Sequence, residues 1–275
     1  MKKIKTCLIS VFYKTNLDKI VALLKEQGVQ IYATGGTYDF IKDLDDSVKT
    51  IESLTTYPSI LGGRVKTLHP KVFGGILGRL QNEKDVEEMK QYEIPAFDLV
   101  IVDLYPFEET VKKTDDPAQI IEKIDIGGIS LIRAGAKNFN EVVIVPDSKY
   151  YLEFMELYKN QDGCTSIEDR KRFAKYAFAT SSHYDGMIYD WFAKDDDTSD
   201  LNIHIDSRSE LRYGENPHQK AAFYGNLDDV FEKLHGKDLS YNNLLDLEAG
   251  LNLIREFDEP TFAILKHNNP CGIAS

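Results

Sequence analysis

The chain has 275 residues, of which 42% are hydrophobic and 28% charged. This composition excludes a disordered tail protein, and a mean hydropathy of −0.35 without a run of about 18 apolar residues excludes a membrane-spanning segment. The formal net charge of −12 argues against nucleic acid as a partner, although it leaves room for a local basic pocket that binds a small anion. A length of this kind predicts one large domain or two smaller ones.

The first residues resemble the charged start of a signal peptide, but Tyr13 and Lys14 interrupt the apolar stretch that follows. We therefore expect a first strand there. Cys7, Cys164 and Cys271 are far apart in sequence and show no metal-ligand spacing. Unpaired cysteines of this kind suit a reducing compartment, so the sequence predicts a cytoplasmic protein.

Residues 1–150 alternate between short β-rich runs and helical patterns, which is typical of an α/β domain with a parallel sheet. Strands are predicted at 4–11, 29–33, 97–102 and 141–145. An amphipathic helix is predicted at 17–27, between the first two strands. Residues 151–200 are predicted to be a helical extension and linker, with helical periodicity over 166–194 and an acidic break at 195–200. New apolar patterning begins at Ile203, and we expect a separate part at 201–275.

The stretch from Gly62 to Gly75 holds four glycines together with Arg64 and Lys66, in a chain of negative net charge. Glycines allow the backbone to approach a ligand closely, and the two basic side chains supply positive charge, so this loop is predicted to hold an anion. A flexible surface loop with solvated charges is the alternative. A second glycine motif, Thr34 to Thr37, lies between a predicted strand and a helix expected to start near Tyr38, where free N–H groups favour anion binding.

Four titratable residues stand beside glycine or proline in the first domain: Lys66, Tyr105, Asp125 and Lys137. Each taken alone is typical of a solvated side chain, a helix cap or a packed strand end. All four are nevertheless expected near the carboxyl ends of parallel strands, where such domains bind ligands. Together they favour a binding site with proton-transfer chemistry.

Six motifs follow one another: Ser10-Val11 with Lys14, Ala33 to Thr37, Gly62 to Pro70, Leu104 to Phe107, Asp125 to Gly128, and Arg133 to Asn138. In this order they resemble the IMP cyclohydrolase part of the bifunctional purine biosynthesis family. The stretches Leu211 to Gln219, Leu239 to Asp246 and Lys266 to Gly272 resemble the start of that family's AICAR formyltransferase part. The resemblance covers essentially the whole chain.

The resemblance implies a methylglyoxal-synthase-like first domain, a hydrolase of cyclic amidines that closes 5-formamidoimidazole-4-carboxamide ribonucleotide to inosine monophosphate with loss of water. It implies no metal or redox cofactor for this step. Lys137 would be the proton donor and acceptor, with Asp125 also catalytic, and Lys66 would pair with Tyr105 and lower the pKa of its phenol. The residues implied to bind substrate are Ser10, Phe12, Tyr13, Lys14, Thr34, Gly35, Gly36, Thr37, Arg64, Lys66, Thr67, Val102, Asp103, Asp125 and Ile126.

Two positions depart from the family's usual pattern. The family commonly reads Ser-Val-Ser-Asp-Lys at the first motif, whereas this chain has Phe12 and Tyr13, so only backbone contacts are expected to carry over at Phe12. The family also commonly has Asn before Leu-Tyr-Pro-Phe, where Asp103 here adds a negative charge. We expect phosphate binding to be reorganised at Phe12 and Tyr13, and we expect the backbone of Asp103, not its side chain, to reach the base.

For residues 201–275 the resemblance implies a partial α/β, cytidine-deaminase-like segment of the formyltransferase. Lys266 would stabilise the transition state, His267 would act as base, and Arg212 and Tyr213 would bind substrate, with 10-formyltetrahydrofolate as co-substrate of the complete protein. The chain ends shortly after His267. We therefore expect little transferase activity from it alone, and expect either a homodimer or a partner chain that carries the remainder.

Two other functions remain open. A non-catalytic methylglyoxal-synthase-like module that binds a phosphate or nucleotide effector would need the Thr34 to Thr37 motif but not four proton-capable groups. Methylglyoxal synthase itself would act on dihydroxyacetone phosphate with carboxylate bases, and the later transferase motifs count against it.

Overall fold

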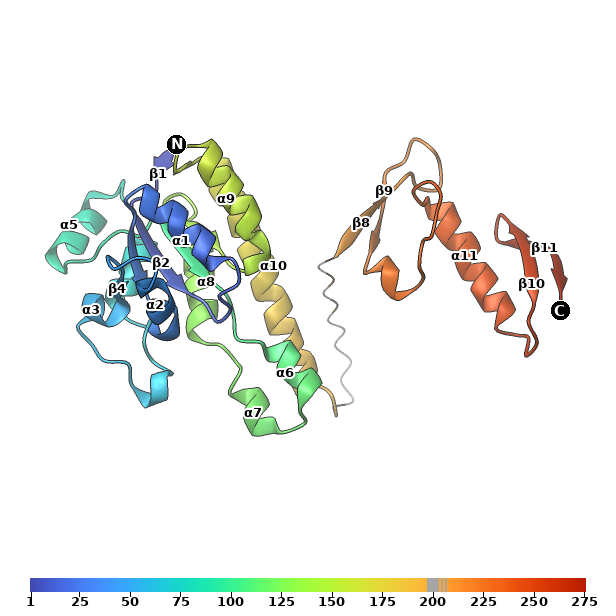
Figure 1. Cartoon of the computed structure of the whole chain (residues 1–275), viewed down its shortest axis with the longest axis horizontal. Helices are drawn as coiled ribbons and strands as arrows, with labels where there is room; N and C mark the ends of the chain where they lie inside the picture. The colour runs from blue at the N-terminus through green and yellow to red at the C-terminus, as the bar shows by residue number, and fades with distance from the viewer. Residues whose placement is uncertain (197–202, 204, 206) are drawn as a thin grey trace. The chain divides into compact units, whose positions relative to one another are not determined.

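The computed structural model describes residues 1–196, 203, 205 and 207–275, and the predicted linker at 195–200 therefore lies mostly outside the described residues. Its contacts divide the chain into two compact units, Met1–Asn202 and Ile203–Ser275 (Figure 1). Each unit has its own secondary structure and is considered by itself. Among the described helices, none has both the length and the apolar composition that crossing a membrane requires.

A five-stranded parallel sheet forms the centre of the first unit. Its strands lie in the order β4-β3-β2-β5-β6, with bounds Lys49–Thr50, Gln30–Ala33, Thr6–Ser10, Leu99–Val102 and Val143–Val145. The order confirms the predicted α/β class with a parallel sheet. The strand predicted at 4–11 is shorter than expected, with bounds Thr6–Ser10, and a separate strand β1 (Lys2–Lys3) precedes it and pairs in the antiparallel sense with β7 (Cys164–Thr165).

The sheet is buried on both faces, which explains why its strands read as apolar runs. Successive side chains point to opposite faces, so Cys7 and Ile9 join one hydrophobic cluster and Leu8 joins the other. Helices α1 (Leu17–Glu26), α2 (Gly35–Lys42) and α9 (Tyr151–Asn160) contribute to the first cluster. Helices α3 (Ile51–Thr55), α4 (Pro70–Leu77) and α8 (Gly127–Lys137) contribute to the second.

Helix α10 (Ile167–Phe192) is the longest element and packs on the same core. Ser166 and Asp169 form a capping box that satisfies the free N–H groups at its start. Phe173 joins the cluster on one face of the sheet, and Ala174 and Ala177 join the cluster on the other. The helices predicted as an extension therefore share a core with the sheet and belong to the same compact unit.

The remaining elements of this unit lie in its connections. They are the short 3-10 turns η1 (Leu61–Gly63) and η2 (Ser148–Tyr150), and the helices α5 (Glu83–Gln91), α6 (Phe107–Lys113) and α7 (Pro117–Ile121). Helix α2 begins at Gly35, three residues before the start expected near Tyr38. The helix was predicted to start too far along the chain because glycine is a poor helix former. The first turn of a helix nevertheless accepts glycine where its backbone N–H groups must stay accessible to a ligand.

The second unit contains two antiparallel hairpins and one longer helix. Strands β8 (Arg208–Leu211) and β9 (Ala221–Tyr224) form the first hairpin, followed by the 3-10 turn η3 (Leu227–Asp229) and by α11 (Tyr241–Ile254). Strands β10 (Phe262–Lys266) and β11 (Asn269–Ala274) form the second. His267 and Asn268 join these strands with φ of 55° and 61°, the left-handed pair that a tight two-residue hairpin turn requires.

Candidate active site

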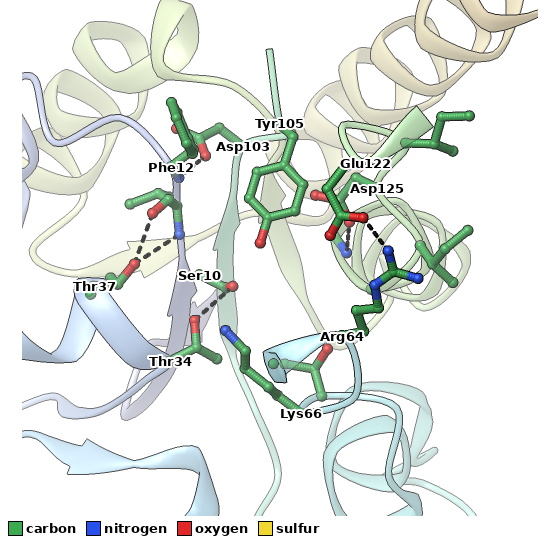
Figure 2. A pocket seen from close by; sticks show the side chains of 18 of the residues that line it. Ser10, Phe12, Thr34, Thr37, Arg64, Lys66, Asp103, Tyr105, Glu122 and Asp125 are labelled. Atoms are coloured by element: carbon green, nitrogen blue, oxygen red, sulfur yellow. Dashed lines mark hydrogen bonds and ion pairs between the residues drawn. The ribbon is translucent and has the colours of Figure 1, made fainter. Parts of the chain in front are cut away.

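A cavity of roughly 670 Å³ opens at the carboxyl edge of the sheet, in the first unit. The loops after β2, β3 and β5 form one side of it, and residues 62–67 and 121–128 form the other (Figure 2). This is the edge where parallel sheets bind ligands. The predicted site residues that line it are Ser10, Phe12, Lys14, Thr34, Gly36, Thr37, Arg64, Lys66, Thr67, Asp103, Tyr105, Asp125 and Ile126.

The amino end of α2 and the end of β2 meet at one end of the cavity. The hydroxyls of Ser10 and Thr34 lie 2.9 Å apart, and the Thr37 hydroxyl donates to the Val11 carbonyl at 2.9 Å and accepts from the Val11 N–H at 3.1 Å. Thr37 therefore holds the loop, and its hydroxyl proton is already committed. The first N–H groups of α2, which belong to Gly35 and Gly36, carry the positive end of the helix dipole.

The neighbouring wall of the cavity contains Asp103, one of the positions at which the chain departs from the pattern of the family it resembles. Its carboxylate accepts hydrogen bonds from the backbone N–H groups of Phe12 and Tyr13, the latter at 3.0 Å. Those two N–H groups were expected to bind substrate, and the structure corrects this expectation because Asp103 occupies them. Burial raises the pKa of Asp103 to about 6, although the two N–H bonds and the charge of Lys14 oppose the shift.

Lys14 and Tyr13 have different surroundings. The Lys14 ammonium donates to the carbonyls of Val11, at 2.5 Å, and of Phe12, and burial lowers its pKa. The Tyr13 side chain does not line the cavity, because its hydroxyl donates to Glu109 at 2.6 Å. Val102 is a fully buried core residue, so its side chain cannot contact a ligand either.

Lys66 lines the cavity, and Figure 2 shows its ammonium directed toward the hydroxyls of Ser10 and Thr34. The glycines around it make this path possible: a Cβ on Gly63 would lie 3.0 Å from Lys66 Cε, and one on Gly35 would lie 3.5 Å from its Nζ. Gly62 and Gly63 have φ of 65° and 92°, which other residues rarely adopt. Arg64 instead forms an exposed ion pair with Glu122 at the cavity mouth.

The stretch from Gly62 to Gly75 is not a single loop, and the prediction was wrong in this respect. Its second half is helix α4, which begins at Pro70. A Cβ on Gly75 would lie 2.4 Å from the Pro95 carbonyl oxygen, so this glycine serves close packing. His69 caps the helix by accepting the Lys71 N–H at 3.1 Å, and neither residue lines the cavity.

Tyr105, after β5, and Asp125, before α8, lie beside each other at the cavity (Figure 2). Burial raises the pKa of Asp125, and the hydrogen bond from the Gly128 N–H at 2.6 Å and the Lys66 charge oppose that rise. Burial also raises the pKa of Tyr105, together with the charges of Asp125 and Glu122. The expectation that Lys66 lowers the pKa of Tyr105 is therefore wrong in this structure, because desolvation and two carboxylates dominate.

The structure does not bring Lys137 to this cavity. Lys137 is the last residue of α8, whereas the cavity lies at the first residues of that helix, Gly127 and Gly128. A rise of about 1.5 Å per residue over ten steps places its backbone about 15 Å from Gly127. Its side chain is exposed and lines a separate shallow groove with Phe139 and Phe178.

The four predicted transferase residues lie in the second unit. Arg212 stacks over the Tyr213 ring at 4.8 Å, and its guanidinium donates to the Tyr213 hydroxyl at 3.2 Å. Lys266 ends β10, and His267 forms half of the following turn, with both side chains exposed.

Sequence reasoning missed several residues of the site. Ile121, Glu122 and Ile124 line the cavity and flank the Asp125 motif, and Gly127 and Gly128, which belong to that motif, line it without having been assigned to the site. Their proximity to Asp125 was the available signal. Tyr184, in the middle of α10, also reaches the Asp125 loop, and no sequence pattern connected it to the site.

The parallel sheet, with a cavity at its carboxyl edge, belongs to a methylglyoxal-synthase-like domain: the family described as "MGS-like domain" matches residues 16–130. The family described as "AICARFT/IMPCHase bienzyme" matches residues 135–275. The chain is 55% identical over 274 residues to the bifunctional purine biosynthesis protein PurH of Bacteroides thetaiotaomicron, an alignment that covers 100% of this chain and 54% of that protein. The chain belongs to the AICARFT/IMPCHase bienzyme family.

Other relatives agree. PurH of Microcystis aeruginosa is 44% identical over 98% of this chain and 55% of its own length, and PurH of Chlorobium phaeobacteroides is 42% identical over 98% and 54%. The chain thus spans about half the length of the curated relatives it matches. The solved structure titled "Crystal structure of ForH" is 35% identical, with a TM-score of 0.60, and the match covers 69% of this chain and 99% of that one.

Proposed function

We propose that the chain is an IMP cyclohydrolase of de novo purine biosynthesis, which closes 5-formamidoimidazole-4-carboxamide ribonucleotide to inosine monophosphate in the cytoplasm. The observation that carries the proposal is one cavity that brings Lys66, Tyr105 and Asp125 together beside the amino end of α2. An effector-binding module would need the helix terminus alone. Three proton-capable groups facing the same space favour catalysis.

The phosphate of the ribonucleotide would bind at the end of the cavity formed by α2. Gly35 and Gly36 offer free N–H groups, and the hydroxyls of Ser10 and Thr34 can turn toward an anion. Lys66 points to the same region. Asp103 sets the limit of this subsite, because its carboxylate repels a phosphate and already holds the neighbouring N–H groups.

The base would then extend toward Tyr105 and Asp125. In the first step the carboxamide nitrogen attacks the formyl carbon, a C–N bond forms, and a proton passes from that nitrogen to the formyl oxygen. In the second step the resulting hydroxyl leaves as water with the proton of the formamide nitrogen. Asp125 would accept the first proton, Tyr105 would donate to the formyl oxygen, and Lys66 would stabilise its developing negative charge. The raised pKa of Tyr105 supports this role, because a protonated phenol can donate.

Lys137 can take part only from another copy of the chain, because it lies at the far end of α8. A homodimer is therefore part of the proposal, with Lys137 of one copy near the cavity of the other. We expect Lys137→Ala and Lys66→Met to be nearly inactive separately. Mixed in equal amounts after joint refolding, they should regain about a quarter of the parental activity, because half of the dimers would hold one intact site.

Activity that stays at the level of the separate variants, in a mixture shown by mass spectrometry to contain the mixed dimer, would contradict a shared site. Lys171→Ala is the matched control. Lys171 lines the same groove as Lys137, and its loss is expected to leave ring closure unchanged.

The direct test separates the two reactions of the family. The purified chain is incubated with the formylated ribonucleotide, and in parallel with the unformylated ribonucleotide and 10-formyltetrahydrofolate, the co-substrate proposed for the complete protein. We expect inosine monophosphate from the first mixture only. Ribonucleotide binding without product in calorimetry would favour the effector module, and release of methylglyoxal from dihydroxyacetone phosphate would favour the synthase.

A further inference from the structure

Tyr184 connects the long helix α10 to the loop that carries Asp125. Its hydroxyl accepts the Asp125 N–H at 2.8 Å and donates to the Lys123 carbonyl at 2.7 Å. One hydroxyl thus bridges two backbone groups of the segment between α7 and α8, in which Glu122, Ile124, Asp125 and Ile126 line the cavity. The bridge spans about 60 residues of sequence and joins a helix that does not itself line the cavity to the loop that does.

The Tyr184 ring is held in place by apolar neighbours. It is buried in a small cluster with Phe107 and Ile120, and its ring packs at the edge of Phe107 with centroids 6.2 Å apart. Burial raises the pKa of the phenol, so the hydroxyl stays protonated at neutral pH. A neutral phenol can donate and accept at once, which the bridge requires.

Asp125 is consequently fixed at two points. Tyr184 binds its N–H, and the Gly128 N–H binds its carboxylate at 2.6 Å. Gly128 also leaves space for that carboxylate, since a Cβ there would lie 2.7 Å from Asp125 Oδ2. The groups whose charge or hydrogen bonds act on this carboxyl from other segments are Lys66 and the Tyr105 backbone. Without the Tyr184 bridge the Asp125 N–H and the Lys123 carbonyl lose the partner they share.

We propose that Tyr184 is a positioning residue, which sets the orientation of the Asp125 carboxylate in the cavity by holding the backbone on its amino side. The proposal rests on the cyclohydrolase function proposed above. It assigns to α10 a part in the site, in addition to its packing against the sheet.

The test is Tyr184→Phe, which removes the hydroxyl and keeps the buried ring. We expect the Asp125 amide to exchange its hydrogen about 5-fold faster, because one hydrogen bond is worth about 1 kcal/mol. In the ring-closure assay kcat should fall about 10-fold with KM within a factor of about two, since the bridge orients a reacting group. The acid limb of the pH–rate profile should move to lower pH, because a looser loop exposes the Asp125 carboxyl to water.

Tyr176→Phe is the matched control on the same helix. Its hydroxyl bonds Glu153 at 3.4 Å, and it lies eight residues, or about 12 Å along the helix, from Tyr184. It should leave the Asp125 exchange rate and the pH profile unchanged. Unaltered Asp125 exchange in Tyr184→Phe, or a kinetic change equal to that of Tyr176→Phe, would overturn the proposal. If the parent chain proves inactive, the cyclohydrolase function fails, while the exchange comparison still decides whether Tyr184 holds the loop.

Discussion

Lys66→Met is expected to lower kcat for ring closure by about 10²- to 10⁴-fold, the range typical of losing a positioned group that handles charge or protons. Methionine fills nearly the same volume beside Gly63, so the packing of the loop should survive. What disappears is the positive charge aimed into the cavity. The measurement is steady-state formation of inosine monophosphate at saturating and at low substrate.

Separate values of kcat and KM distinguish the possible roles of Lys66. If the ammonium binds only the phosphate, KM should rise while kcat holds, because ground-state and transition-state binding weaken equally. A fall in kcat itself assigns the charge to the reacting atoms. Lys71→Met is the control: this lysine belongs to the same motif but lies on α4 near Glu93, so parental kinetics are expected. Parental kcat in Lys66→Met would remove Lys66 from the chemistry.

Periodicity predicted the sheet well because its strands are buried on both faces. The runs at 97–102 and 141–145 contain β5 and β6, and the first two strands and the helix between them lie close to their predicted bounds. The short edge strand β4 was missed, since two residues give no readable alternation. The start of α2 was missed for a different reason: Gly35 and Gly36 disfavour a helix locally, and the sheet edge imposes one.

The site shows where sequence reasoning stops. Motifs placed Ser10, Lys66, Tyr105 and Asp125 around one cavity, because the carboxyl ends of parallel strands share an edge. Motif spacing could not show that the glycine stretch becomes a helix at Pro70, or that burial and the charges of Asp125 and Glu122 raise the pKa of Tyr105. Both depend on packing against segments distant in sequence.

Asp103→Asn is expected to change how stability depends on pH. Burial holds the pKa of Asp103 at about 6 in the folded chain, above the ordinary value of about 3.9 that applies after unfolding. Between these values the folded state binds more protons than the unfolded state, so the contribution of Asp103 to stability is present below pH 4 and is lost as the pH rises to 6. Two pKa units correspond to about 3 kcal/mol. Lys14 and Asp147 are the charged groups that also act on this carboxyl.

Urea unfolding followed by the fluorescence of Trp191, the chain's single tryptophan, reports on the first unit, because Trp191 packs against the Phe107 cluster. The free energy of unfolding of the parent minus that of Asp103→Asn should fall by about 3 kcal/mol between pH 4 and pH 7, since asparagine does not titrate.

Asp116→Asn is the control of opposite sign. Hydrogen bonds from Gln119 and Ala118 lower the pKa of Asp116, so the parent-minus-variant difference in unfolding free energy should not fall with rising pH. A parent-minus-variant difference at Asp103 that is flat or rises over this range would mean that the carboxylate is stabilised by the Phe12 and Tyr13 N–H groups more than burial opposes it. The site would then contain a permanently charged wall, and the phosphate would have to bind farther from it, toward Lys66.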